Sequence, residues 1–527
     1  IGAKAQIVST NSNEGGTYFF SSNGSGQMNT QKILKYDSIS HIILAQTVST
    51  NQSRFCLVEQ GNIYTKYVDV PAQYKVNDFS ILNDTVYFCG QENMGNSITR
   101  GFIGYISKED LFTELGSSSS FNFTPLNLTT CDSDSCFTIR KIMTYHNNLG
   151  VRIVAGIGSI YYGEAAADCL QEVFPGEYST VLTYHPKYYY DCLMIYKVTE
   201  EQLVSNQQAV NHSFANPTYA TGNKVFFYRN PTYLSYNYSS EIFEDITLTN
   251  DYICVVSIMD INIISTYSDT INPSLNYNNI FIRRFDKNTF NQVSNKILLS
   301  TEGHTAAGVK IEYVGNNKIA LAYTLNSGKD VGTYVTKINL ETSPFTIIHT
   351  SFVDYSELGS TLLCDLEYMS NQDSLLLLKR SLINNNLLDK VYYLNIKDNA
   401  TFAYTTKYLT VNTPQIYWYN ILYNSEQNRY AIVGENNNIV RLFDNIILDE
   451  ERECYIYVPI EITSYNTPID TATNLVQCDF PEWSHFTSDG QSYVVHLGTN
   501  IYNAILKYLD LSIVAQGKVY NSCIYQR

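Results

Sequence analysis

Short apolar runs recur along the chain and are separated by Asn, Asp, Gly and Ser. The clearest block covers residues 76–90, where two apolar runs flank the pair Asn83–Asp84. Such a pair between two short apolar runs is typical of a β-hairpin. A third apolar run follows at residues 101–106. Because the 3.6-residue spacing of an amphipathic helix is nearly absent, the pattern predicts short antiparallel strands.

The order of a hairpin followed by a third strand recurs along the chain. Residues 243–254 repeat the hairpin, and residues 280–285 repeat the third strand. Hairpins are predicted to begin near residues 78, 141, 245, 310, 365, 420 and 483. Five of the six intervals span 55 to 65 residues, and an insertion at residues 158–190 explains the interval of 104. A repeat of this length with three or four short strands is typical of β-propeller blades.

These repeats predict an all-β chain that folds as a seven-bladed β-propeller of four-stranded antiparallel blades over residues 71–527. Residues 1–70 contain further strand-like runs at residues 41–45 and 54–58. Either they close the ring against the C-terminal blade, or they form an extra blade and make eight.

The composition argues against two classes of partner, nucleic acids and membranes. Only 16% of the 527 residues are charged, and the net charge is -16. An acidic surface repels phosphate backbones, so we expect no nucleic acid partner. No apolar stretch is long enough to span a bilayer, so we expect no transmembrane segment. The 45 Tyr and 24 Phe against two Trp also favour strands.

The chain contains none of the common catalytic or phosphate-binding motifs. We therefore expect no cofactor and no metal site, and the sequence favours a protein without catalytic activity. The repeat suggests another kind of site. The aligned position just before each predicted inner strand is polar in all but one repeat; these residues are Asp78, Lys141, Asp245, Lys310, Asp365, Asn420 and Trp483.

These aligned side chains are expected to converge at one mouth of the central channel. One interpretation is a ring that binds a polar ligand; the other is that the charges pair with each other, as Asp245 would with Lys310. Exposed pairs contribute only about 0 to 1 kcal/mol each, so we expect the ring not to be needed for stability. Tyr188, Tyr189 and Tyr190, at the end of the insertion, are expected near the same mouth, where their flat rings would suit sugars or a protein partner.

The block Val86–Gly90 followed by Gly101–Tyr105 carries a family resemblance. In repeat texture, residues 70 to 510 resemble the secreted or lipid-anchored propeller-like surface proteins of gut Bacteroidales bacteria. The resemblance implies an exported, extracytoplasmic protein and carries no activity. Many members begin the mature chain with a lipidated Cys, where this sequence has Ile1.

Three functions follow as hypotheses. The first is a non-catalytic extracytoplasmic binding protein that recognises a glycan or a protein at the channel mouth. The second is a propeller-fold glycoside hydrolase or polysaccharide lyase, which would need two carboxyl groups in an open pocket. The third is a structural surface or fibre subunit that self-assembles, for example by donating an N-terminal strand to a neighbour.

Export also predicts a disulfide bond. The chain has 11 Cys, an odd number, and Cys131 and Cys136 bracket a four-residue loop. An oxidising compartment would close this loop. Mass spectrometry of the protein prepared without reductant is expected to find Cys131 linked to Cys136. Free thiols at both positions would contradict the pairing and weaken the assignment to an oxidising compartment.

Overall fold

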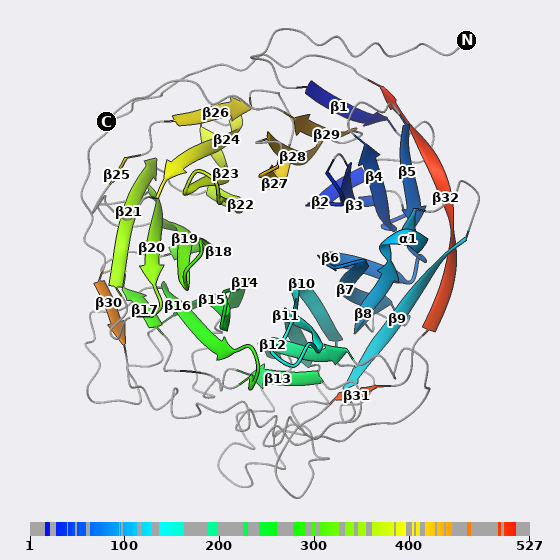
Figure 1. Ribbon diagram of the computed structural model, residues 1–527, viewed down its shortest axis with the longest axis horizontal. Helices are drawn as coiled ribbons and strands as arrows, with labels where there is room; N and C mark the ends of the chain where they lie inside the picture. The colour runs from blue at the N-terminus through cyan, green and yellow to red at the C-terminus, as the bar shows by residue number, and fades with distance from the viewer. Residues whose placement is uncertain are drawn as a thin grey trace, which may run out of the picture.

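A computed structural model shows a ring of small antiparallel sheets around one axis, which is a β-propeller (Figure 1). The predicted all-β propeller fold is confirmed. The structure describes residues 16–21, 28–38, 40–47, 50–59, 64–93, 95, 99–112, 118–128, 136–162, 188–198, 225–229, 242–260, 278–290, 293, 297–300, 306–325, 332–341, 346–354, 361–383, 386–396, 403–404, 407–411, 417–426, 429–436, 439–444, 461–464, 494–496 and 500–512.

The strands follow each other from the channel outwards as antiparallel meanders. Four meanders stand as separate sheets, and two of these sheets carry one additional short edge strand. Their strands are β10 (Cys136–His146), β11 (Arg152–Tyr162), β12 (Tyr188–Val198) and β13 (Val225–Arg229); β14 (Ile242–Leu248), β15 (Tyr252–Asp260), β16 (Asn278–Asp286) and β17 (Ile297–Ser300); β18 (Ala306–Tyr313), β19 (Lys318–Leu325), β20 (Gly332–Asn339) and β21 (Thr346–Asp354); and β22 (Thr361–Met369), β23 (Ser374–Ile383), β24 (Asn386–Asn395) and β26 (Lys407–Val411).

The remaining meanders belong to one 14-stranded sheet. Their strands are β2 (Met28–Lys35), β3 (Ser40–Thr47), β4 (Ser53–Glu59) and β5 (Tyr64–Asp69); β6 (Tyr74–Leu82), β7 (Thr85–Asn93), β8 (Thr99–Ser107) and β9 (Ser118–Leu128); and β27 (Tyr417–Asn424), β28 (Arg429–Asn436) and β29 (Ile439–Asp444), on which β1 (Gly16–Ser21) lies. The hairpin predicted at Asn83–Asp84 is β6–β7, with Asn83 at a φ of 54°.

Both ends of the described chain lie on the outside of this ring. β1 pairs antiparallel with β29, so an N-terminal strand completes the C-terminal meander. β32 (Asn500–Ser512) then pairs in turn with β9, β5 and β1, which joins three meanders into the largest sheet (Figure 1). Two shorter C-terminal strands, β30 (Glu461–Ser464) and β31 (Val494–His496), lie on β17 and β9. Three C-terminal strands therefore lie along the outside of the ring.

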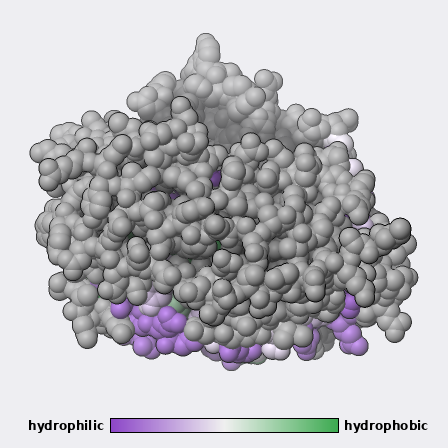
Figure 2. All heavy atoms as spheres, turned by 90° about the horizontal axis from the view of Figure 1, so that it is seen from above, coloured by the Kyte–Doolittle hydropathy of each residue, from purple (hydrophilic) through white to green (hydrophobic). Residues whose placement is uncertain are grey.

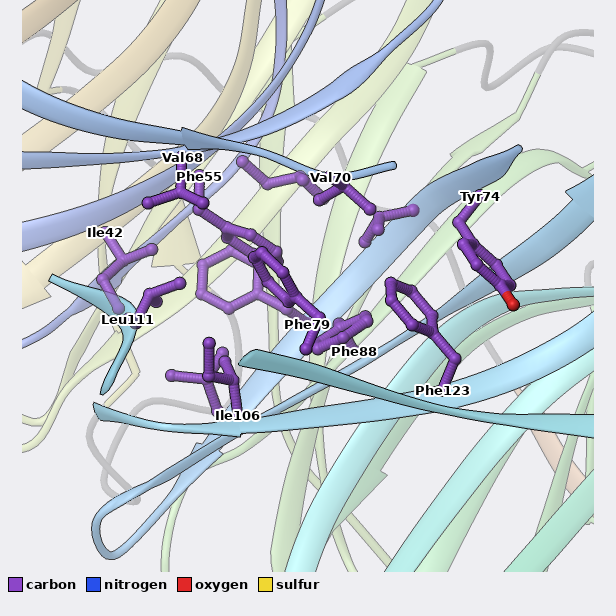
Figure 3. Packing of buried hydrophobic residues seen from close by; sticks show 14 of the residues in the cluster. Ile42, Phe55, Val68, Val70, Tyr74, Phe79, Phe88, Ile106, Leu111 and Phe123 are labelled. Carbon is purple, nitrogen blue, oxygen red and sulfur yellow. The ribbon is translucent and has the colours of Figure 1, made fainter. Parts of the chain in front are cut away.

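The core lies between neighbouring meanders, and an aromatic cluster fills the space between β2–β5 and β6–β9 (Figure 3). Phe55 contacts Phe79 and Phe88 edge-to-face, at ring-centroid distances of 5.5 and 5.7 Å. Tyr74 stacks on Phe123 at 3.8 Å. A Cβ atom at position 104 would lie 2.0 Å from the Phe88 ring, which explains the glycine there. Aromatic packing of this kind stabilises the contact between meanders beyond area burial alone.

The two faces of the ring differ. Turns between first and second strands are short and polar, and Figure 2 shows hydrophilic residues gathered along one face of the molecule. At the other end of the strands, β11 runs to Tyr162 and β12 begins at Tyr188. The predicted insertion at residues 158–190 was therefore drawn too wide, because its first and last residues belong to strands. Residues 163–187 lie outside the described part of the chain.

Candidate functional site

The aligned polar residues lie inside the inner strands, and not just before them at a channel mouth as predicted. Asp78, Lys141 and Asp245 stand near the middle of β6, β10 and β14, each one residue after a β-bulge. In the described part of the chain these residues are Lys32, Asp78, Lys141, Asp245, Lys310, Asp365 and Asn420, which we call the channel ring. Lys32 on β2 was missed by the sequence analysis, and Trp483 lies outside the described residues.

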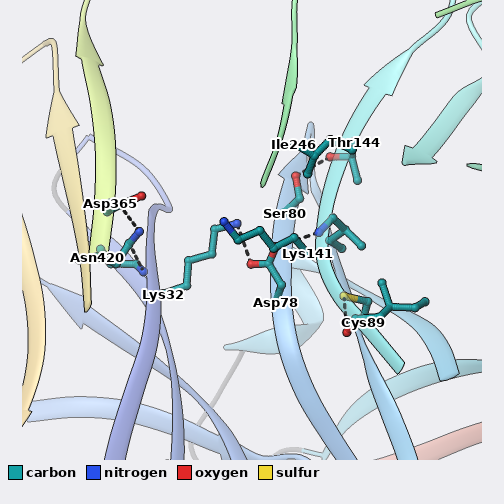
Figure 4. Close-up of polar contacts among 12 residues, drawn as sticks. Lys32, Asp78, Ser80, Cys89, Lys141, Thr144, Ile246, Asp365 and Asn420 are labelled. Carbon is teal, nitrogen blue, oxygen red and sulfur yellow. Dashed lines mark hydrogen bonds and ion pairs between the residues drawn. The ribbon is translucent and has the colours of Figure 1, made fainter. Parts of the chain in front are cut away.

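The members of the channel ring alternate in charge and pair between neighbouring strands (Figure 4). The Nζ of Lys32 lies 2.7 Å from a carboxylate oxygen of Asp78, and that of Lys141 lies 2.6 Å from Asp245. Burial opposes ionisation of Asp245, but the charges of Lys141 and Lys310 outweigh it and hold its pKa below the ordinary value. Burial likewise opposes the charge of Lys141, yet Asp245 raises its pKa. The Lys141–Asp245 pair therefore keeps both partners charged.

Four members of the ring also accept a hydrogen bond from the inner edge of the next strand. The first strand of each meander is an edge strand, whose outward N–H groups have no further strand beside them. Asp78 accepts from the amide of Ile142 at 2.8 Å, and Asp245 accepts from that of Ile311 at 3.2 Å. Asp365 accepts from Ile421 at 2.9 Å, and Asn420 accepts from Ile33 at 2.9 Å. Every one of these amides follows the ring residue of the next inner strand.

The bulges explain how two consecutive side chains reach the same neighbour. A bulge breaks the alternation of a strand, so the bulged residue and the ring residue both turn towards the next meander. Asn77 donates to the carbonyl of Ile139 at 2.8 Å. Arg140 donates to the carbonyl of Phe243 at 2.7 Å. At these two places the next inner strand is held by its carbonyl as well as by its amide or ring side chain.

Asn420 stands where the alternation cannot continue. A ring of seven members that begins with Lys32 and alternates in sign would place two cations side by side at its end. The Asn420 amide avoids this: its Nδ2 donates to Asp365, and its Oδ1 accepts from the amide of Ile33. A neutral group with one donor and one acceptor therefore closes the ring between an acid and a lysine (Figure 4).

Two further carboxyl groups, missed in the sequence, lie one tier along the channel. Glu312 and Glu367 stand two residues after Lys310 and Asp365, on β18 and β22. Burial, followed by the charge of Asp365, raises the pKa of Glu367 to about 8. Burial, followed by Glu367, raises the pKa of Glu312 well above its ordinary value. A repeat alignment limited to one position per strand gave no signal for this pair.

The tyrosines predicted in a loop begin a strand instead. Tyr188, Tyr189 and Tyr190 are the first residues of β12, and the backbone register places Tyr188 opposite Tyr162 and Tyr189 opposite Tyr161. In the same register Leu193, and not Tyr190, stands level with Ile157, the residue paired with Lys141. The tyrosines therefore lie several residues along the strand from the channel ring. Of the predicted disulfide, Cys131 and the side chain of Cys136 are outside the described residues.

Comparison with known proteins finds no family model and no curated protein sequence that matches this chain. Among the described residues, no helix is long and apolar enough to cross a membrane. The same part of the chain contains no group of three or more His, Cys, Asp or Glu side chains placed to hold a metal ion.

The contacts of the channel ring indicate that it contributes to the stability of the fold, whereas the sequence predicted that it would not be needed for stability. Asp78 and Asp245 are only 5% and 8% exposed, whereas the side chains of their partners Lys32 and Lys141 are partly exposed. Asp245→Ala would remove the partner of Lys141 and of the Ile311 amide together. Because the Lys141 side chain is 33% exposed and can be solvated, most of the cost comes from the hydrogen bonds lost at the buried carboxylate. We expect a loss of about 1 to 3 kcal/mol of unfolding free energy, measured by urea denaturation.

The matched control is Glu426→Ala. Glu426 pairs with Lys35 at 2.8 Å, but its side chain is 61% exposed. Such a pair contributes about 0 to 1 kcal/mol, so this variant is expected to unfold like the unaltered protein. Equal stability of both variants would show that the ring is not structural.

Proposed function

We propose that this protein is a non-catalytic, extracytoplasmic binding protein that takes a glycan or a protein ligand on the face of the ring where β11 ends and β12 begins. The observation that carries the proposal is the pairing of Tyr161 with Tyr189 and of Tyr162 with Tyr188 at that strand end. Tyrosines supply flat, amphipathic contact area at low entropic cost, which suits a sugar ring. A glycan is therefore the ligand class that this strand end favours.

The contacts of the channel ring favour a structural role for the ring itself and a binding role for the face that it supports. Its carboxylates and amines already bind each other and the neighbouring backbone, as in the pairs Lys32–Asp78 and Lys141–Asp245. Groups used in this way are poor ligands for a further molecule. The ring then serves as the scaffold, and recognition belongs to the face it supports. This separation is common, because rigid elements position the residues that bind.

A second function is favoured by one observation. Glu312 and Glu367 are two carboxyl groups on neighbouring inner strands, and at neutral pH Glu367 keeps its proton. A glycoside hydrolase needs such a protonated carboxyl as its general acid beside a second carboxylate. A propeller-fold glycoside hydrolase or polysaccharide lyase is therefore the alternative to pure binding.

We also propose that the ring contains seven blades, with β1 as the outer strand of the last one. The support is the channel ring itself, in which each inner strand gives one side chain that meets the next, and in which Asn420 returns to Ile33 on β2. In this arrangement residues 1–70 supply both a blade and the closing strand. An experimental density map with eight sheets around the axis would contradict it.

The binding proposal is tested with the full chain on a glycan array, followed by calorimetry of any glycan that binds. The double variant Tyr161→Ser/Tyr189→Ser is expected to weaken binding about tenfold or more, since aromatic contacts are worth roughly 0.5 to 1.5 kcal/mol each beyond buried area. Leu149→Ser is the control, because Leu149 is 78% exposed in the turn at the opposite end of the β10–β11 hairpin. It is expected to bind normally.

Unchanged affinity of the tyrosine variant, at an unchanged melting temperature, would place the ligand elsewhere. Cleavage of the bound glycan, detected as new reducing ends and lost in Glu367→Gln, would favour the hydrolase instead.

A further inference from the structure

The contact between the inner strands β18 and β22 lacks a bond that the channel ring makes elsewhere. The two other ring lysines bind the acid of the next inner strand, at 2.7 and 2.6 Å. Lys310 holds the same position on β18, and Asp365 is the acid that follows it on β22. Within the described part of the chain, no oxygen accepts a hydrogen bond from Lys310 or forms an ion pair with it. The third lysine of the ring is therefore left without an acceptor.

Asp365 is left with one carboxylate oxygen unused. In Asp78 and Asp245, Oδ2 accepts from the amide of the next inner strand, and Oδ1 binds the lysine of the preceding one. Asp365 also accepts from the next strand with Oδ2, from the amide of Ile421 at 2.9 Å and from Asn420. Among the described residues nothing donates to its Oδ1. By comparison with the other two acids, this is the oxygen on the side of β18.

The packing of β18 turns Lys310 towards β22. Val309 and Ile311 are buried in the core that β18 shares with β15 and β16. Side chains alternate along a strand, and the bulge of β18 comes before Gly308, so Gly308 and Lys310 both face away from that core. β22 is the inner strand on this other side (Figure 1). The unpaired ammonium and the unused oxygen of Asp365 therefore belong to the same contact.

There is room for a further group beside Lys310. A Cβ atom added at Gly308 would meet no atom within 4 Å. On β6 and β10 the residue just before the ring residue is bulged, and its side chain, Asn77 or Arg140, binds the next strand. β18 has no bulged side chain at that place, since its bulge lies further back. Lys310 and Asp365 are both partly exposed, so this open position is continuous with solvent.

The pKa shifts agree with two charges that lack partners. In the Lys141–Asp245 pair each partner outweighs burial and favours the charged form of the other. Burial, followed by the neighbouring charge of Lys141, instead lowers the pKa of Lys310. Burial raises the pKa of Asp365 to about 6. A ligand that supplied the missing opposite charges would favour the ionised form of both groups.

The charges of this contact select the class of ligand. A simple anion bound to Lys310 would lie beside the carboxylate of Asp365, and a simple cation bound to Asp365 would lie beside the ammonium of Lys310. A molecule that carries both charges avoids both repulsions. Charge-assisted hydrogen bonds are also roughly twice as strong as neutral ones, so a zwitterion uses these two groups better than an uncharged hydroxyl does. A free α-amino acid carries its ammonium and its carboxylate on one carbon atom.

We propose that the β18–β22 contact is a binding site for a free α-amino acid, whose carboxylate binds Lys310, whose ammonium binds Asp365 and whose body occupies the open position at Gly308. The bound ligand takes the place of the missing ion pair and completes the third lysine–acid link of the channel ring. This site is separate from the tyrosine pairs of β11 and β12, and the inference does not depend on glycan binding.

The test is calorimetry of the full chain at pH 7 with a set of free L-amino acids. For one that binds, the N-acetyl and carboxamide derivatives each lose one charge and are expected to bind at least about tenfold more weakly. Lys310→Met, which removes the ammonium, and Gly308→Leu, which fills the open position, should weaken binding as much, at an unchanged melting temperature. Lys35→Met, at the turn end of β2, is the matched control and should bind normally.

A second control separates this site from the proposed glycan site. The variant Tyr161→Ser/Tyr189→Ser should bind the amino acid as the unaltered protein does, whether or not it binds a glycan. The proposal is overturned if no free amino acid binds, if the N-acetyl or carboxamide derivative binds equally well, or if Gly308→Leu binds normally. It is also overturned if a neutral sugar binds in preference and is lost in the same two variants.

Discussion

The bond on which the rest of this ring depends is the one between a ring side chain and the edge amide of the next inner strand. A propeller buries the faces of its sheets but leaves the first strand of each sheet with an unpaired edge at the axis. A backbone N–H left unpaired out of solvent costs about as much as a lost hydrogen bond. Asp78, Asp245, Asp365 and Asn420 remove that cost by accepting from the neighbouring strand. The same contacts set the spacing of the sheets, and with it the place of everything the ring carries.

The alternation of lysine and acid suggests that neighbouring meanders contact each other as pairs, one with a ring lysine and one with a ring acid. A second contact repeats with the same spacing: the hydroxyl of Tyr36 donates to the carbonyl of Lys108, and the hydroxyl of Tyr145 donates to that of Lys287. In both places the lysine ammonium also lies over the tyrosine ring. Each tyrosine follows a ring lysine by four residues, and each partner lies in the meander with the ring acid. An odd number of members then leaves one position unmatched, which Asn420 fills.

Much of this arrangement is readable in the sequence because it repeats. The hairpins with Asn–Asp turns and the aligned positions from Asp78 to Asn420 follow from period and turn chemistry, which are local signals. Lys32 was missed because residues 1–70 were taken as strands of uncertain role. The depth of the ring was misjudged because a β-bulge has no sequence signature of its own. Without the bulges, the aligned residues looked like polar positions before a strand, exposed at a mouth and of little value to stability.

The side-chain contacts between neighbouring strands could not be predicted from the repeat pattern of the sequence. That Asp245 would pair with Lys141 and not with Lys310 depends on side-chain geometry, since both lysines stand on neighbouring inner strands. That Glu312 and Glu367 stand on neighbouring inner strands depends on the closed ring, since they are 55 residues apart in the sequence. Only the register with β12 shows that Tyr161 and Tyr162 stand opposite Tyr189 and Tyr188. Such contacts are set by the closed ring and not by any one repeat.

Amide hydrogen exchange resolved by residue tests the central claim most directly. The amides of Ile33, Ile142, Ile311 and Ile421 face the channel and have no strand partner on that side. If the channel ring binds them, they will exchange as slowly as the amides paired within β7 and β19, in the interior of the same sheets. Exchange of these four amides as fast as those in the exposed turns would show that the inner edges are open to water and that the ring does not join the sheets.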